Sequence, residues 1–177
     1  MRPLIRSLAV AVLVLSVASC AAAVDLPDGA NALVQRVIDG DTIEARFVVD
    51  GRAVDERVRL IGIDTPETKK PGSPVECYGP EASARTTELL PPGTPIMVRR
   101  DTEPRDDYGR LLGYVYRTSD GLFVNETLLA EGFASKLSIS PNDRLADRLA
   151  AVEAAARESG RGMWAFCFTD PTGSVTP

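Results

Sequence analysis

Two short acidic turns constrain the fold of this chain more than any other feature of its sequence. Residues 39–42 read Asp-Gly-Asp-Thr, residues 64–67 read Asp-Thr-Pro-Glu, and each turn directly follows an apolar, strand-like run. Each turn is therefore expected at a strand end, where side chains from neighbouring strands converge. A hard cation such as Ca²⁺ requires oxygen ligands from carboxylates, carbonyls and water. We predict that Asp41 and Asp64 hold one such cation.

Arg59 precedes Asp64 on the same predicted strand, so its guanidinium is expected beside the cation site without occupying the position of the cation. Arginine binds phosphate through two parallel hydrogen bonds. A cation, an arginine and the spare carboxylate of Glu67 suit attack on a phosphodiester, because cations stabilise charge on the phosphoryl oxygens. Either turn alone is better explained as an ordinary turn whose carboxylate caps backbone N–H groups. Both turns together with the arginine favour the site.

Composition removes several classes of chemistry. The 177 residues include no histidine, which excludes Ser-His-Asp and Cys-His nucleophiles and His-ligated zinc. The formal net charge of −5 argues against a generally basic surface that coats duplex nucleic acid, although a local basic site remains compatible with it. The length and the 44% apolar content predict one globular domain.

The first 23 residues predict a signal peptide, because a charged start precedes a short apolar run and small residues. Residues 17–20 also match a lipobox, in which Cys20 would be lipidated. Ordinary cleavage after Ala23, or an incidental cysteine in a discarded peptide, remain alternatives. We expect an exported protein, either secreted or anchored by lipid to the outer face of the membrane.

The two other cysteines, Cys77 and Cys167, form an even pair in a chain expected to be exported, which predicts one disulfide. Two free buried thiols are the alternative. We predict a polar linker over residues 24–31, a single folded domain over residues 32–167 and a disordered tail over residues 168–177.

Apolar periodicity and turn residues predict an α+β domain built on a small closed barrel of five strands with three helices. Predicted strands cover residues 33–38, 42–49, 54–63, 96–98 and 111–116, and predicted helices cover residues 79–90, 125–131 and 143–159.

Arg110 is the second candidate for binding phosphate, because it enters the fifth predicted strand beside Gly109, which leaves room for a ligand. Taken alone, a surface ion pair with Asp106 or Asp107 would be its more ordinary role. Tyr108 is a candidate contact for a nucleotide, with packing in the core or at its rim as the alternative.

These motifs resemble the thermonuclease, or staphylococcal-nuclease-like, family. The resemblance rests on four stretches in the order and spacing of the family, namely residues 37–42, 59–68, 78–83 and 107–110. It implies an OB-fold barrel and a Ca²⁺-dependent phosphodiesterase that cuts DNA and RNA to leave 3′-phosphate ends. An OB barrel also provides a groove that suits single strands.

The resemblance assigns a role to each of five site residues. Asp41 and Asp64 would hold Ca²⁺ with their side chains, and Thr65 with its main-chain carbonyl. Arg59 and Arg110 would bind the phosphate and stabilise its transition state.

In the same pattern Glu67 would be the general base for the attacking water. The chain departs from the family in two places. Residues 134–140 contain no tyrosine where relatives offer aromatic rings to the base, and Asp107 stands where a lysine can occur. Both changes would weaken substrate binding without removing the chemistry, because stacking contributes about 1–3 kcal/mol per base.

Two other functional classes compete with a monomeric nuclease. The first is an OB-fold module that binds nucleic acid without cutting it, and the second is an envelope protein in which Ca²⁺ is structural. The presence of the carboxylates and of both arginines favours the nuclease.

Overall fold

The computed structural model describes residues 24–68, 72 and 74–167. The predicted signal peptide, with Cys20, and the predicted tail over residues 168–177 lie outside this part of the chain. None of the described helices is both long and apolar enough to span a bilayer.

The centre of the fold is a closed five-stranded barrel in the order β1-β2-β3-β6-β5. Four of its five junctions are antiparallel, and the parallel pairing of β3 with β6 completes the closure. The prediction of an α+β fold on a five-stranded barrel is therefore confirmed. The strands are β1 (Ala30–Asp39), β2 (Thr42–Val49), β3 (Arg52–Leu60), β5 (Pro95–Arg99) and β6 (Leu111–Arg117).

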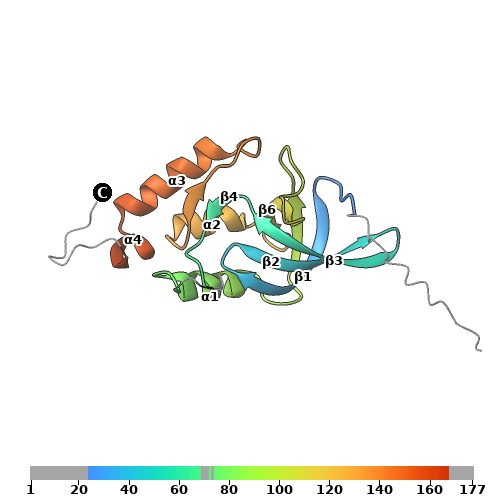
Figure 1. Ribbon diagram of the computed structural model, residues 1–177, viewed down its shortest axis with the longest axis horizontal. Coiled ribbons are helices and arrows are strands. Elements are labelled where there is room, and N and C mark those ends of the chain that lie inside the picture. The colour runs from blue at the N-terminus through green and yellow to red at the C-terminus, as the bar shows by residue number, and fades with distance from the viewer. Residues whose placement is uncertain (1–23, 69–71, 73, 168–177) are drawn as a thin grey trace, which may run out of the picture.

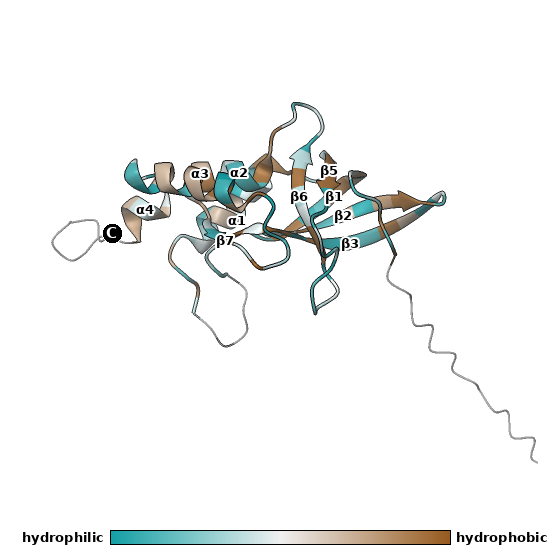
Figure 2. Ribbon diagram, turned by 90° about the horizontal axis from the view of Figure 1, so that it is seen from above, coloured by the Kyte–Doolittle hydropathy of each residue, from teal (hydrophilic) through white to brown (hydrophobic). Residues whose placement is uncertain are grey.

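Alternation along β2 shows why these strands enclose a core. Ile43, Ala45 and Phe47 are buried in the barrel, whereas the residues between them are partly or fully exposed. Hydrophobic and hydrophilic residues accordingly both occur along β2 and β3 (Figure 2). Asp50 and Gly51 join the two strands with positive φ values of 50° and 74°, as a two-residue hairpin turn requires.

The helices gather at one end of the molecule, and the β2–β3 hairpin forms the other end (Figure 1). They are α1 (Gly79–Leu89), α2 (Val124–Ala130), α3 (Ala146–Glu158) and the short α4 (Met163–Phe166). α3 begins three residues later than predicted, because the Ala146 amide donates to the Asp143 carbonyl in a turn.

The prediction of one strand over residues 54–63 is wrong at its end. β3 stops at Leu60, and a separate strand β4 (Gly62–Asp64) pairs with β7 (Ser135–Leu137) in a small second sheet. The pattern of apolar residues runs through the break, so periodicity alone did not reveal it.

The break at Ile61 has a steric and a hydrogen-bonding cause. The Ile61 amide donates to the Gly113 carbonyl at 3.1 Å, while the Ile61 carbonyl accepts from the side-chain Nδ2 of the buried Asn125 at 2.8 Å. Gly62 has a φ of 80°, and a Cβ there would lie 2.4 Å from Leu149 Cδ1. Only glycine therefore allows this bend, which carries Asp64 away from the line of β3.

The segment over residues 24–31 differs from the predicted linker, because it packs on the barrel. Leu26 is buried in the core, and the Asp28 carboxylate pairs with Arg99 of β5. β1 already begins at Ala30, where it pairs with Val98.

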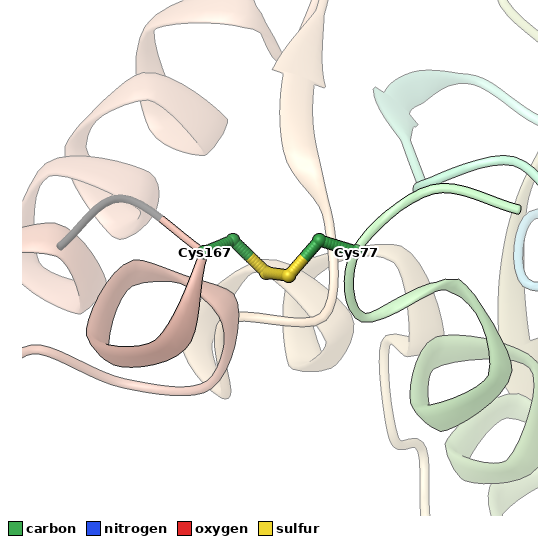
Figure 3. Close-up of a disulfide and its surroundings, with 2 residues drawn as sticks. All are labelled: Cys77 and Cys167. Carbon is green, nitrogen blue, oxygen red and sulfur yellow. A yellow bond between two sulfur atoms is a disulfide. The ribbon is translucent and has the colours of Figure 1, made fainter. Parts of the chain in front are cut away.

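A disulfide joins Cys77 to Cys167, with the two Cα atoms 5.9 Å apart (Figure 3). Cys77 lies just before α1, and Cys167 directly follows α4. The bond therefore fastens the end of the described chain to the segment that connects the second acidic turn to α1.

Candidate functional site

The two acidic turns meet at a single arginine nitrogen. Asp41 lies between β1 and β2, Asp64 ends β4, and Arg59 is the penultimate residue of β3. Nη2 of Arg59 lies 3.0 Å from Asp41 Oδ2 and 2.8 Å from Asp64 Oδ1. The structure therefore brings together the two carboxylates that the sequence paired.

Contact between the turns fixes the Asp41 carboxylate. Its Oδ2 accepts the Thr65 amide at 3.1 Å, and its Oδ1 accepts the Thr42 hydroxyl at 3.0 Å. A Cβ on Gly40 would lie 2.6 Å from Thr65 Oγ1, so glycine is required for the turns to approach so closely. Asp41 is thus buried with defined partners, whereas Asp64 remains exposed.

The pKa of the Asp64 carboxyl group is raised in this site. Partial burial is the largest cause that raises its pKa, and the carboxylates of Asp41, Glu76 and Glu67 raise it further, against the opposing charge of Arg59. The ionised form of Asp64 is therefore disfavoured until more positive charge is present.

Arg59 lies closer to the two carboxylates than its place in the sequence predicted. Its Nη1 donates to the carbonyls of Leu60 and Ile63 at 2.6 and 2.9 Å, across the bend that separates β3 from β4. These bonds direct Nη2 between the two carboxylates. A positive group therefore occupies the position between Asp41 and Asp64 that we had expected only a cation to fill.

The donor set fits a hard cation. Two carboxylate oxygens flank one positively charged nitrogen, and both neighbouring turns offer main-chain carbonyls, which are the ligand types that Ca²⁺ takes. Within the described residues no group of three or more His, Cys, Asp or Glu side chains could hold a metal, so main-chain carbonyls and water would have to complete the coordination of a cation bound here.

Arg110 reaches the same cavity as Arg59. This cavity has a volume of about 390 Å³, and both arginines line it. The Arg110 guanidinium also forms an ion pair with Asp106, the ordinary role considered from the sequence, with Nε 2.7 Å from Oδ2. Its side chain is 31% exposed, so it remains accessible from the cavity.

Comparison with known proteins decides the family. The family described as "Staphylococcal nuclease homologue" matches residues 57–166, which include β4, both arginines and the helices. The chain belongs to this nuclease family.

Curated relatives support this membership. A thermonuclease of Staphylococcus intermedius is 42% identical over 136 residues, which cover 77% of each chain. A thermonuclease of Staphylococcus hyicus is 37% identical over 131 residues, or 74% of this chain and 73% of the relative. Endonuclease YncB of Bacillus subtilis (strain 168) is 41% identical over 135 residues, and the match spans 76% of this chain but only 61% of YncB.

Tyr108 and two aliphatic residues line this nuclease-family cavity with exposed side chains. Tyr108 is 86% exposed, and Leu137 and Ile139 also present exposed apolar side chains. The Tyr108 ring is therefore not packed in the core, and its contact with a nucleotide stays a prediction. Leu137 and Ile139 belong to residues 134–140, the segment that contains no tyrosine.

Glu67 is hydrogen-bonded in this nuclease-family site. Its Oε1 accepts the Thr68 amide at 2.9 Å, and its own amide donates to Glu76 Oε2 at 2.9 Å. The negative charge of Glu67 also raises the pKa of Asp64. The Glu67 carboxylate therefore lies close enough to Asp64 to affect the candidate cation site.

Asp39, which was not among the predicted site residues, links the first acidic turn to Thr68 and α1. Its Oδ1 accepts hydrogen bonds from the Gly40 amide and from the hydroxyls of Thr68 and Ser83 at 2.9, 2.7 and 2.9 Å. Burial raises the pKa of Asp39, but these bonds and one with the Glu67 carboxyl outweigh it and lower the pKa. The hydroxyl partners lie 29 and 44 residues away, so no local pattern could reveal them.

Proposed function

We propose that this chain is an exported, Ca²⁺-dependent nuclease that cuts DNA and RNA, prefers single strands and leaves 3′-phosphate ends. Membership of the nuclease family makes the chain a hydrolase of phosphodiester bonds. One observation carries the proposal further. Asp41 and Asp64 meet at one nitrogen of Arg59, and Arg59 shares a cavity with Arg110.

The carboxylates of Asp41 and Asp64 and the main-chain carbonyl of Thr65 are the proposed Ca²⁺ ligands. A bound Ca²⁺ supplies Lewis-acid stabilisation of the negative charge on the phosphoryl oxygens. The raised pKa of Asp64 supports this assignment, because a nearby cation would favour its ionised form.

The two arginines are proposed to bind the scissile phosphate from the cavity. The guanidinium groups of Arg59 and Arg110 would place positive charge where the transition state gains negative charge. Glu67 is proposed to accept the proton of the attacking water. The hydrogen bond that its Oε1 accepts from the Thr68 amide fixes its position for that role.

The cavity supports a preference for single strands. Tyr108 offers an exposed ring, and Leu137 and Ile139 offer apolar contact, beside the arginines that would bind the phosphate. A base can reach such a surface only when it is unpaired. Tyr108 is therefore the proposed contact for the nucleotide next to the scissile bond.

Export is supported by the cysteines of the folded domain. The bond between Cys77 and Cys167 is stable where the surroundings are oxidising, which agrees with a signal peptide over residues 1–23. Secretion, or a lipid anchor at Cys20, would both place the enzyme outside the cytoplasm.

Digestion of heat-denatured DNA by the mature chain tests this proposal. We expect fragments with Ca²⁺ and none when a chelator removes it, and the fragments should carry 3′-phosphate ends that require a phosphatase before tailing. Folded protein that binds the DNA but leaves it intact in both tubes would contradict the nuclease and support the binding module. Equal cutting in both tubes would contradict the requirement for Ca²⁺.

A further inference from the structure

We propose that Asp106 is a positioning residue that holds the Arg110 guanidinium with its terminal nitrogens directed to the substrate phosphate. The inference rests on the proposed function, in which Arg110 binds that phosphate. It assigns to Asp106 a role beyond an ordinary surface ion pair.

The two carboxylate oxygens of Asp106 accept hydrogen bonds from different groups. Oδ1 accepts the amides of Tyr108 and Arg110 at 3.0 and 2.9 Å, which closes the turn before β6. Oδ2 accepts Nε of Arg110 at 2.7 Å. One carboxylate therefore fixes both the backbone and the side chain of Arg110.

Because Asp106 binds only Nε of Arg110, it leaves the two terminal nitrogens of the guanidinium unoccupied. In the pair of Arg46 with Asp55, the carboxylate takes both Nε and Nη2 of the arginine. Asp106 takes only Nε, because the backbone amides occupy Oδ1. Within residues 24–68, 72 and 74–167, neither Nη1 nor Nη2 of Arg110 has a hydrogen-bond partner, so both can bind two oxygens of one phosphate.

A second contact restrains the plane of the guanidinium. The Arg110 Cζ lies 5.5 Å from the centre of the Tyr108 ring, within the range of a cation–π interaction. The turn that brings this ring back over the arginine includes Gly109, with a φ of 77°. Side-chain exposures of 18% for Asp106 and 31% for Arg110 place the pair at the wall of the cavity, away from open solvent.

The substitution Asp106→Asn should keep the hydrogen bonds to the backbone amides and remove the one to the Arg110 side chain. The amide oxygen can still accept both backbone amides, whereas the new NH₂ group would face the Nε–H of Arg110, donor against donor. The turn should therefore persist while the guanidinium loses its orientation. With Ca²⁺ and a single-stranded oligonucleotide we expect kcat/KM to fall about 10- to 100-fold, mainly through kcat, because misplacement of a catalytic group costs about that much.

Asp55→Asn is the matched control, because it removes the carboxylate partner of another arginine, Arg46, and neither residue lines the cavity. The kcat/KM of Asp55→Asn should stay within about twofold of the wild type, because an exposed ion pair contributes little to stability and this one does not line the cavity. In an Arg110→Ala background, Asp106→Asn should have no further effect, since its orienting role requires the arginine. A full additional loss in that background, or unchanged kcat/KM in the single variant, would overturn the proposal.

The NMR signal of the Arg110 Nε–H group gives a readout that does not require activity. In the wild type the proton should exchange slowly and resonate downfield, and in Asp106→Asn it should shift upfield and exchange faster. An unchanged signal would overturn the proposal even if the enzyme is active. Wild-type protein that cuts nothing would refute the proposed function, and the NMR comparison would still decide whether Asp106 holds Arg110.

Discussion

Arg59→Ala is expected to lower kcat/KM on denatured DNA by about 10³-fold, the range for removal of a guanidinium that stabilises a phosphoryl transition state. Arg59 lines the cavity and contacts both carboxylates of the proposed metal site through Nη2. Its loss removes a fixed positive charge from the place where the phosphate would bind. Initial rates over a range of substrate and Ca²⁺ concentrations measure the effect.

Arg57→Ala is the control for Arg59→Ala. Arg57 lies on the same strand two residues earlier, but it is exposed and does not line the cavity. Its activity should stay close to that of the wild type. Thermal unfolding with Ca²⁺ present must show that both variants are folded at the assay temperature. Retention of more than about a tenth of wild-type activity by folded Arg59→Ala would contradict its role.

Replacing both Cys77 and Cys167 by serine is expected to lower the free energy of unfolding by about 4 kcal/mol in the chain-entropy account. The disulfide closes a loop of 90 residues, so its loss gives the unfolded chain much more freedom. In the folded state it also fastens α4, whose Met163 and Trp164 are buried. Denaturant unfolding followed by circular dichroism measures the difference.

The reduced wild type is the control for this double variant. A thiol reductant should lower the stability of the wild type to that of the variant and should leave the variant unchanged. A difference below about 1 kcal/mol between the oxidised wild type and the variant would contradict the stabilising role of the bond.

The barrel was predictable because its strands have strong local signals. Ile43, Ala45 and Phe47 alternate with polar residues, and Asp50-Gly51 marks the hairpin. The pairing of Asp41 with Asp64 was also predictable, since both turns follow strands whose ends must meet in a small closed barrel.

The finer geometry of the site depends on contacts between distant residues. The bend at Ile61 requires Gly113 and Asn125, neither of which marks residues 58–63 as anything but one strand. That bend also decides where Arg59 points, so its approach to both carboxylates was not predictable. The small sheet of β4 and β7 was missed for the same reason, because its partners are far apart in sequence.

A crystal structure of the mature chain grown with Ca²⁺ tests the central proposal most directly. We expect one ion that contacts a carboxylate oxygen of Asp41 and one of Asp64 at about 2.3–2.6 Å, with Arg59 and Arg110 facing the adjacent cavity. Calcium bound elsewhere, or Asp41 and Asp64 still joined through Arg59 with no ion at saturating Ca²⁺, would contradict it.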